Sequence, residues 1–341
     1  MFSKVVGHEK VKNVLMSSVM GERVGHAYIF EGPEGVGRLT TAKAFAKVLL
    51  CENSSEGEAC GGCKSCSMCD SDNHPDVQVI TNQTYDESKK SKDVLVDTIR
   101  NMKKDVYIKP FSAERKIYII PRADTMNLHA QNSLLKVLEE PPEYCTIILI
   151  AENSNQFLPT ILSRAVSIRF FPLSAAMVED YLSRQYPSLG EQVGAIAAMS
   201  GGCIGKAEAL AESEEVTQLR NDLFSRMTAM VGKGRKTAYD LMLFLKQNKD
   251  EVRLLMDMMR ELFRDLMFFC QTGSCERIGN KDKTSEIEKI GSGILSDVPV
   301  KLLEILLKYE DYLSKNISHA QISQCMSLEI WEVINAGSYR N

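Results

Sequence analysis

Short apolar runs, separated by stretches with helical periodicity, fill the first half of the chain. Five of these runs have the length and the β-branched content of buried strands, at residues 27–31, 77–80, 116–120, 146–151 and 166–170. Strands that alternate with helices along a chain form a parallel sheet with helices on both faces. The pattern therefore predicts an α/β fold for this half.

Three helices are predicted between these strands. Residues 40–50 (TTAKAFAKVLL) and 94–106 (VLVDTIRNMKKDV) place apolar residues three or four positions apart. Residues 127–140 (NLHAQNSLLKVLEE) do the same, and the pair Pro141–Pro142 that follows cannot continue a helix. The polar stretch 81–93 is predicted to be a loop.

The pattern changes after Pro172. Helical periodicity then continues to the end of the chain without a strand-like run. A length of 341 residues is typical of two or three domains. We therefore expect an α/β domain over residues 1–171, a small helical domain over 172–210 and a larger all-helical domain over 211–341.

Composition restricts the class of protein. The net charge is −4, which argues against a surface that holds nucleic acid everywhere and leaves room for a local basic patch. No run of 18 apolar residues is present, and the N-terminal sequence MFSKVVGHEKVKNVL lacks the apolar core of a signal peptide. The sequence thus predicts a cytoplasmic protein without a membrane partner.

A glycine-rich turn follows the first predicted strand and precedes a predicted helix. Its sequence, GPEGVG, has the spacing of a phosphate-binding loop. Such a loop holds phosphates with backbone N–H groups, a Lys and a Ser or Thr that binds Mg²⁺. Gly32, Gly35 and Gly37 keep the backbone part, but Arg38 and Leu39 replace the Lys and the hydroxyl residue.

A second part of a hydrolytic site is also missing. In an ATPase with this layout, an apolar strand ends in Asp-Glu, which serves Mg²⁺ and the attacking water. Here residues 116–120 are followed by Pro121 and Arg122, and the next acid is Asp124. The two losses together indicate a nucleotide site that has lost hydrolysis. Nucleotide binding without hydrolysis stays open.

Several motifs occur in the order found in one family. They are GHEKVKNVL and GHAYIFEGPEGVG near the N-terminus, a Cys-rich insert, HPD at 74–76, LLKVLEEPP at 134–142 and LPTILSR at 158–164. In this order they resemble the clamp-loader subunits of bacterial DNA polymerase III. The resemblance covers residues 5–210 with specific motifs, and the remainder by length and helicity alone.

That resemblance implies an AAA+ module with a RecA-like sheet, a three-helix lid and a helical collar that joins subunits into a ring. In the family, gamma/tau-type subunits hydrolyse ATP, whereas another type has lost the same residues as this chain. A working lid also carries an Arg that touches phosphate, where this chain has Gly205 beside Lys206. The implied role is a non-hydrolysing subunit that supports the loading of a sliding clamp on primed DNA. Gamma/tau and delta subunits are the implied partners.

Five of the ten Cys residues lie within residues 51–69, and in a cytoplasmic chain such a cluster favours metal over disulfides. The resembled family holds structural zinc with four of them, here Cys51, Cys60, Cys63 and Cys66. Four thiolates form a closed tetrahedral site without an open position for catalysis. Cys69 and, more weakly, His74 compete as ligands, and an iron–sulfur cluster is the less favoured occupant.

Arg164 follows LPTIL and Ser163. In the resembled family this Arg reaches the nucleotide site of a neighbouring subunit, where a guanidinium stabilises charge on the γ-phosphate. Ala165 replaces a Cys of the family motif, and that Cys has no evident chemical task. Arg164 is therefore predicted to act as an arginine finger in trans.

Two alternatives stay open. The first is a divergent but active gamma/tau-type ATPase subunit, against which Leu39 and Pro121 argue. The second is a stand-alone zinc-dependent DNA-binding module, against which the net acidity and the absence of an aromatic–basic face argue. An ATP turnover assay tests the first alternative, and a salt-dependent DNA titration tests the second.

Overall fold

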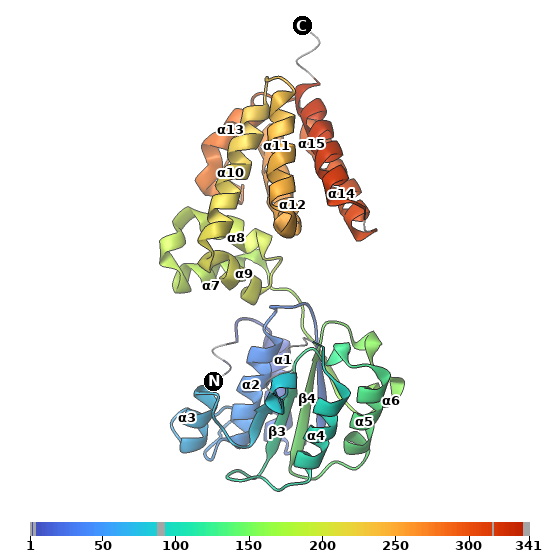
Figure 1. Ribbon diagram of the computed structural model, residues 1–341. Helices are drawn as coiled ribbons and strands as arrows, with labels where there is room; N and C mark the ends of the chain where they lie inside the picture. The colour runs from blue at the N-terminus through green and yellow to red at the C-terminus, as the bar shows by residue number, and fades with distance from the viewer. Residues whose placement is uncertain (1, 3–4, 87–92, 316, 337–341) are drawn as a thin grey trace. The chain divides into compact units, whose positions relative to one another are not determined.

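A computed structural model describes residues 2, 5–86, 93–315 and 317–336. The chain divides into two compact units: unit 1 comprises residues 1–177 with 203–205, and unit 2 comprises residues 178–202 with 206–341. Figure 1 shows a sheet flanked by helices in unit 1 and helices alone in unit 2. Among the described residues, every helix is too short or too polar to span a lipid bilayer.

Unit 1 is built on a parallel sheet with the strand order β2-β3-β4-β1-β5. The strands are β1 (Ala27–Glu31), β2 (Val77–Val79), β3 (Lys116–Ile120), β4 (Cys145–Ala151) and β5 (Val166–Arg169). In the register of the two central strands, Ile29 of β1 lies opposite Leu149 of β4. The predicted strands and the predicted α/β fold class are confirmed.

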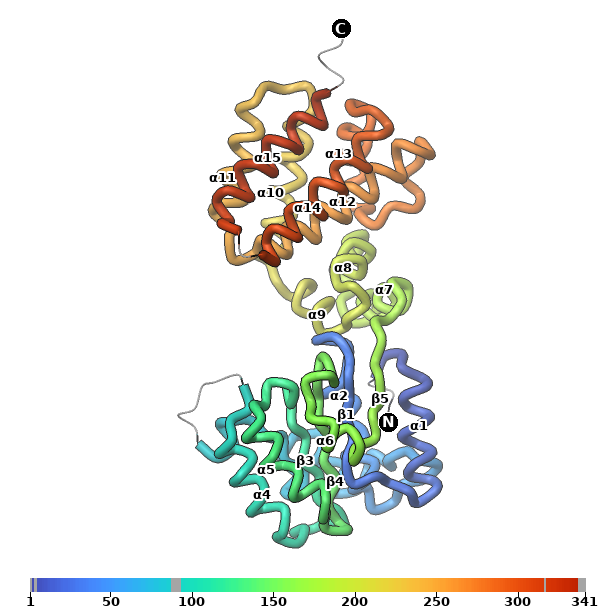
Figure 2. The backbone as a smooth tube through the Cα atoms, turned by 90° about the vertical axis from the view of Figure 1, so that its right-hand side faces the viewer, coloured from blue at the N-terminus to red at the C-terminus, as the bar shows by residue number. Residues whose placement is uncertain are grey.

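Helices cover both faces of this sheet. They are α1 (Glu9–Met20), α2 (Arg38–Leu50), α3 (Lys64–Asp70), α4 (Val96–Val106), α5 (Leu128–Glu139) and α6 (Pro159–Leu162). Successive side chains of a strand point to opposite faces. Ala27 and Ile29 accordingly pack with α4, α5 and α6, whereas Tyr28 and Phe30 pack with α1 and α2. Figure 2 shows these two helical layers on either side of the strands.

The predicted helices of unit 1 are present with ends shifted by at most two residues, and three further helices, α1, α3 and α6, were not predicted. Helix α3 lies in the Cys-rich insert, where the apolar spacing of a helix is absent from KSCSMCD. Its first turn is capped by Cys63, whose Sγ accepts a hydrogen bond from the N–H of Cys66. Within the predicted loop 81–93, residues 82–84 form a 3-10 turn, and residues 87–92 lie outside the described part.

The remaining helices lie wholly or mostly in unit 2. They are α7 (Ala175–Gln185), α8 (Val193–Met199), α9 (Ile204–Glu212), α10 (Glu214–Met230), α11 (Lys236–Gln247), α12 (Val252–Thr272), α13 (Thr284–Gly291), α14 (Val298–Ser314) and α15 (His319–Asn335). The described residues of unit 2 contain no strand, as the periodicity predicts. The division of the helices into a lid over 172–210 and a collar over 211–341 stays a prediction.

A buried polar network fixes the segment between α12 and α13. Asp265 accepts hydrogen bonds from the backbone N–H groups of Gly279 at 3.0 Å and Asn280 at 2.9 Å. Arg220 of α10 forms a two-pronged ion pair with Asp282, at 2.6 and 2.7 Å. Charge-assisted pairs of this kind are strong when buried and fully hydrogen-bonded. The network therefore holds the start of α13 against α10.

Candidate functional site

The glycine loop lies at the carboxyl edge of the sheet, between β1 and α2. Gly32, Gly35 and Gly37 have φ values of 154°, 77° and 105°, in the region that favours glycine. A Cβ on Gly32 would lie 2.6 Å from the carbonyl oxygen of Phe170, so a larger residue does not fit. The N–H groups of Gly35 and Gly37 make no hydrogen bond within the described residues. The backbone part of an anion cradle is therefore present.

Arg38 is directed into the sheet edge. Its side chain is buried, and Nη1 donates a hydrogen bond to the carbonyl oxygen of Ala151 at the end of β4. The same oxygen accepts the N–H of Gly32 at 3.1 Å. Burial lowers the pKa of Arg38, and nearby carboxylates, led by that of Glu152, oppose this shift. A guanidinium stays protonated, so its charge is held at the strand end.

The positions that serve Mg²⁺ in an ATPase carry no suitable ligand. Leu39 places an apolar side chain, 38% exposed, at the start of α2. Beyond β3, Arg122 adopts a left-handed conformation with a φ of 52°. The carboxylate of Asp124 accepts a hydrogen bond from the N–H of Glu152, the residue after β4, at 2.7 Å. The nearest acid after β3 therefore has a structural partner.

Two further segments of unit 1 contact the loop. His8 Nε2 donates to the carbonyl oxygen of Val36 at 2.8 Å, and its ring packs edge-on against Phe170 at 5.0 Å between ring centres. Burial lowers the pKa of His8, which favours the neutral ring. The N–H of Gly205 donates to the carbonyl oxygen of Gly35 at 2.8 Å. These bonds fix the loop from outside its own strand and helix, and the role of His8 was missed from the sequence.

Four cysteine side chains of the insert converge. The Sγ atoms of Cys51, Cys60, Cys63 and Cys66 all lie within 4.8 Å of one another. Two of the sulfur pairs, Cys51 with Cys63 and Cys60 with Cys66, are 4.0 Å apart. A tetrahedral zinc ion with Zn–S bonds of about 2.3 Å needs sulfur atoms about 3.8 Å apart. The four residues therefore fit a closed four-thiolate metal site.

Backbone N–H groups donate hydrogen bonds to sulfur atoms of the four-cysteine group. The N–H of Cys60 donates to Cys51 Sγ at 3.2 Å, and that of Cys66 donates to Cys63 Sγ at 3.4 Å. Hydrogen bonds from Gly62 and Cys63 lower the pKa of Cys60 to about 6. Burial raises the pKa of Cys51 and of Cys66. Thiolates are the form that binds metal, so a bound cation would offset the cost of ionising these two thiols.

Cys69 and His74 lie outside the four-cysteine group. Cys69 packs against the hydrophobic core, and burial raises its pKa to about 11. His74 Nδ1 accepts the N–H of Asp76 at 3.1 Å, so Nε2 carries the proton and donates to Ser65 Oγ at 3.0 Å. Both ring nitrogens of His74 are thus occupied, which argues against His74 as a ligand, and the place of Cys69 outside the group argues against Cys69.

Ion pairs hold the insert against α2. Lys47 is buried, and its ammonium group pairs with Asp70 at the end of α3. Lys43, one turn earlier on the same face of α2, pairs with Asp72 at 2.7 Å. The insert is therefore docked on the sheet domain by contacts that do not involve the four cysteines.

The HPD motif at 74–76 fixes a loop of the sheet domain. Asp76 is buried, and its carboxylate accepts the N–H groups of Phe111 at 2.6 Å, Ser112 at 2.8 Å and Ala113 at 2.9 Å. Burial alone would raise the pKa of Asp76, but these hydrogen bonds outweigh it and hold the pKa below its ordinary value. The ionised carboxylate therefore shapes the segment that leads into β3.

Replacing Asp76 by Asn is expected to destabilise the sheet domain by about 3 kcal/mol at pH 7, since an amide nitrogen would face backbone donors. The pKa of Asp76 is lowered by folding, so its contribution is present above an unfolded value of about 3.9 and is lost as the pH falls through the folded pKa. Urea unfolding of the two proteins at pH 7 and in acid measures both effects.

Asp72→Asn is the matched control, because Asp72 is exposed and pairs only across the surface with Lys43. Exposed pairs of this kind contribute about 0–1 kcal/mol. Equal urea midpoints for Asp76→Asn and Asp72→Asn at pH 7 would contradict a structural role for the HPD motif.

Arg164 lies at the surface just after α6. Its Nη2 is 3.2 Å from the carboxylate of Glu139, and its Nη1 donates to the carbonyl oxygen of Thr160 at 3.0 Å. The side chain remains 36% exposed. These contacts hold the stem of the guanidinium against α5 and α6 and leave part of the side chain accessible.

Sequence comparisons relate this chain to subunits of DNA polymerase III. A family model described as "DNA polymerase III, delta subunit" matches residues 7–174. The chain is 28% identical over 277 residues to the DNA polymerase III subunit delta′ of Bacillus subtilis, covering 80% of this chain and 79% of that one. It is 27% identical over 332 residues to subunit tau of the same organism, covering 90% of this chain and 57% of the relative.

Among solved structures, the clamp loader delta protein of Bacillus subtilis is similar at 13% identity and a TM-score of 0.36. That match covers 94% of this chain and 99% of the other. A parallel sheet with a glycine loop at its carboxyl edge is the arrangement of a phosphate-binding α/β domain. The family model and the delta′-type relatives support a clamp-loader subunit of DNA polymerase III and confirm the resemblance seen in the motifs.

Proposed function

We propose that this chain is a delta′-type clamp-loader subunit that does not hydrolyse ATP at its own loop. It takes a place in a ring with gamma/tau and delta subunits and supports the loading of a sliding clamp onto primed DNA. It lends Arg164 to the nucleotide site of a neighbouring subunit. Cys51, Cys60, Cys63 and Cys66 hold one structural zinc ion.

The state of the phosphate loop carries this proposal. The cation that should reach a γ-phosphate is Arg38, and it is bound to the carbonyl oxygen of Ala151 instead. Leu39 offers no hydroxyl, and the strand end after Ile120 offers no acid. Lys206, which stands beside the place of the lid arginine, is paired with Asp257 at 3.0 Å. Phosphate binding by the loop backbone remains compatible with these observations, whereas hydrolysis requires groups that are missing.

The main alternative is an active gamma/tau-type subunit. Both kinds of subunit are among the relatives, and the chain spans only 57% of the length of the tau subunit it matches. The overall sequence similarity therefore favours neither the gamma/tau type nor the delta′ type of subunit. Leu39, Pro121 and Arg122 favour the non-hydrolysing type, because an ATPase needs other residues at those positions.

The isolated chain is expected to show no ATP turnover above background. Arg38→Lys combined with Leu39→Thr is expected to remain inactive, because Pro121 and Arg122 still lack the acids that hold Mg²⁺ and orient water. Phosphate release from the purified wild-type chain and from the double variant measures the two turnover rates. A gamma/tau subunit assayed in parallel is the active control. Turnover in the wild-type chain that disappears on Arg38→Ala would support the active alternative.

A stand-alone zinc-dependent DNA-binding module is the second alternative. The four-cysteine group is docked on the sheet domain through the ion pairs of Lys43 and Lys47. An insert fixed in this way, with four of its cysteines in one closed group, is typical of structural zinc. Loss of zinc without loss of DNA binding by the whole chain would argue against this alternative.

The proposed arginine finger rests on the position and exposure of Arg164. Its contacts with Glu139 and Thr160 restrict the side chain without burying it. An arginine held in this way loses less conformational entropy when it meets a phosphate. Glu139 belongs to the LLKVLEEPP motif and would act as a positioning residue for the finger.

The last two helices offer a surface for assembly. Val300 and Leu307 lie two turns apart on one side of α14 and are 44% and 62% exposed. On α15, Leu328 is 40% exposed. Exposed apolar residues on a helical domain are typical of subunit contacts. This observation supports a place for residues 211–341 in ring assembly.

A further inference from the structure

The loop between α10 and α11 is strongly basic. Residues 232–236 read GKGRK, and we call them the basic loop. The side chains of Lys233, Arg235 and Lys236 are exposed. Lys289 of α13 is also exposed and lines the same surface pocket as Lys233. In a chain with a net charge of −4, such a local concentration of cations is a distinct feature.

These four cations differ in their pairing from three exposed lysines of α14 and its end. Within the residues that the structure describes, none of Lys233, Arg235, Lys236 and Lys289 forms an ion pair. By contrast, three lysines of α14 and its end are paired: Lys301 with Asp297 at 2.6 Å, Lys308 with Glu329 at 2.7 Å and Lys315 with Asp311 at 2.6 Å. The basic loop therefore keeps its charge available for an external anion.

The backbone of the basic loop is held in place from α15. The N–H of Gly232 donates to Asn335 Oδ1 at 3.0 Å, and the indole N–H of Trp331 donates to the carbonyl oxygen of Lys233 at 2.9 Å. The guanidinium of Arg235 lies 5.6 Å from the centre of the Trp331 ring. An anchored loop presents its cations with a smaller entropy cost of binding than a free loop would.

The helix dipole does not account for this placement of charge. Helix α11 begins at Lys236 with Arg235 as the preceding residue, and its first turn contains no acidic residue. Cations near the amino end of a helix interact unfavourably with its dipole. The contact with Trp331 favours Arg235, whereas the helix dipole favours none of the cations at this position.

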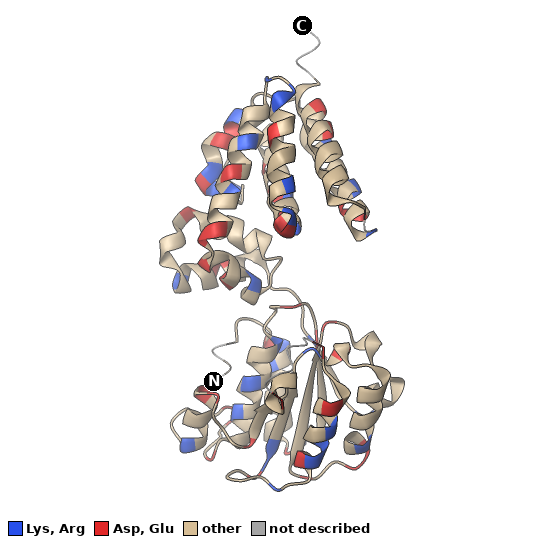
Figure 3. Cartoon of the chain, viewed as in Figure 1, with Lys and Arg blue, Asp and Glu red and all other residues tan. Residues whose placement is uncertain are grey.

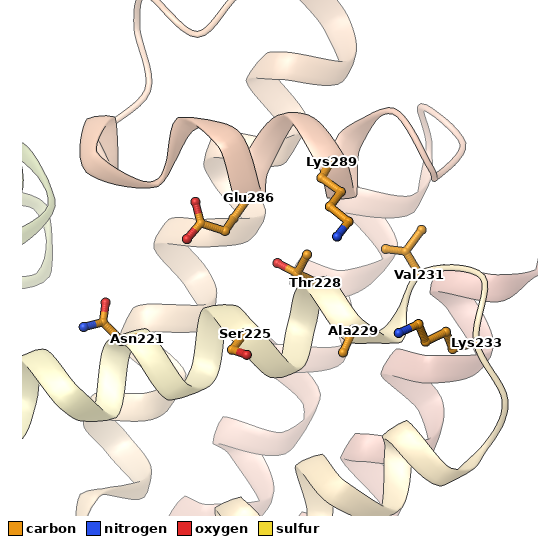
Figure 4. Close-up of a pocket in the computed structure, with 8 residues that line it drawn as sticks. All are labelled: Asn221, Ser225, Thr228, Ala229, Val231, Lys233, Glu286 and Lys289. Atoms are coloured by element: carbon orange, nitrogen blue, oxygen red, sulfur yellow. The ribbon is translucent and has the colours of Figure 1, made fainter.

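The pocket beside the basic loop lies between α10 and α13. Figure 4 shows Lys233 and Lys289 toward one end of the pocket and Asn221 and Glu286 toward the other. The carboxylate of Glu286 is paired with Lys283 at 3.2 Å. The end with the two lysines is therefore the anion-accepting end, and Figure 3 shows Lys and Arg gathered at the nearby loop before α11.

An exposed aromatic ring adjoins these cations. Tyr239 is 56% exposed, and it lies three and four positions after Lys236 and Arg235 on α11, on the same side of the helix. Cations beside an aromatic ring are the combination that holds single-stranded nucleic acid, with the phosphates on the cations and a base on the ring. A peptide of acidic residues would use the cations but would gain little from the ring.

We propose that Lys233, Arg235, Lys236 and Lys289 bind the phosphate backbone of single-stranded DNA, and that a base stacks on Tyr239. The surface belongs to unit 2, whereas the phosphate loop and the four-cysteine group belong to unit 1. From the sequence, no aromatic–basic face was expected, whereas the proposed surface would be one. Lys289 is distant along the chain from the basic loop, so the sequence alone did not bring these residues together.

The test uses the full chain and a fluorescein-labelled oligothymidylate, with fluorescence anisotropy measured over a range of salt concentrations. Lys233→Gln, Arg235→Gln and Lys236→Gln combined are expected to weaken binding at low salt by at least about tenfold. The slope of log K against log salt should become shallower by about 2, at roughly 0.7 for each phosphate that is no longer neutralised. Tyr239→Ala should weaken binding about tenfold, whereas Tyr239→Phe should keep the affinity.

The matched control is Lys301→Gln, Lys308→Gln and Lys315→Gln combined, which removes the same charge from lysines that are already paired. An equal loss of affinity in this control would overturn the proposal, as would an unchanged affinity in Tyr239→Ala. Competition by oligoglutamate at equal charge would overturn it too, and would assign the surface to acidic peptides. Equal circular dichroism spectra and thermal midpoints show that the variants are folded.

Discussion

Arg164→Ala is expected to lower ATP hydrolysis at one neighbouring site of an assembled clamp loader by about 10³–10⁵-fold, the value of arginine fingers elsewhere. Several sites share a ring, so the total rate should fall partially unless the sites are coupled. The stability of this chain should change little, because Arg164 is partly exposed and its pair with Glu139 lies at the surface. Clamp- and DNA-stimulated phosphate release from a reconstituted loader measures the effect.

Two further variants sharpen this experiment. Arg164→Lys should restore activity only in part, since an ammonium cannot form the two parallel hydrogen bonds of a guanidinium. Arg184→Ala is the matched control, because Arg184 is exposed and pairs with Asp180 on its own helix. If the loader with Arg164→Ala assembles and keeps the wild-type rate and clamp-loading yield, the proposed finger is wrong.

Cys63→Ser is expected to reduce the bound zinc from about one ion per chain to a small fraction. Loss of an outer partner of a metal site already costs 10–100-fold in affinity, so loss of a direct thiolate should cost more. Cys63 also caps α3 through its sulfur, so the insert should lose order while the sheet remains folded. Elemental analysis after a fixed exposure to chelator measures the metal, and proteolysis within residues 51–69 measures the order.

Cys69→Ser is the matched control for that prediction, because Cys69 lies in the same insert and outside the four-cysteine group. It should keep its zinc. Absence of zinc from wild-type protein prepared without chelator would refute the metal site itself. A visible absorption band with bound iron would instead indicate an iron–sulfur cluster.

The sheet was predictable because its signals are local. A buried parallel strand needs a short, continuous run of apolar residues, and the five runs at the predicted places became β1 to β5. Helix α3 was not predictable, because KSCSMCD has no apolar periodicity and its ends depend on the cap of Cys63 and the pairing of Asp70 with Lys47. Its stability comes from contacts with distant residues.

In the candidate sites, too, some features were predictable from the sequence and others were not. The short spacing of the cysteines placed the candidate ligands in one small insert, and the family resemblance singled out the four whose sulfur atoms meet. The exclusion of His74 depends on Ser65 and Asp76, which occupy both ring nitrogens. The contact of His8 with the phosphate loop joins residues 28 positions apart, and a Gly-His pair by itself gives no sign of it.

The sequence by itself predicted the order of strands and helices along the chain, showed that Arg38, Leu39, Pro121 and Arg122 differ from the residues of an ATPase, and placed the candidate metal ligands in one insert. Tertiary structure decided that Arg38 bonds to Ala151 and that Lys289 joins the basic loop. The first set rests on periodicity and short spacings, which covalent geometry fixes within a few residues. The second set depends on packing between segments distant in the chain, and local sequence carries no record of which partner a side chain will meet.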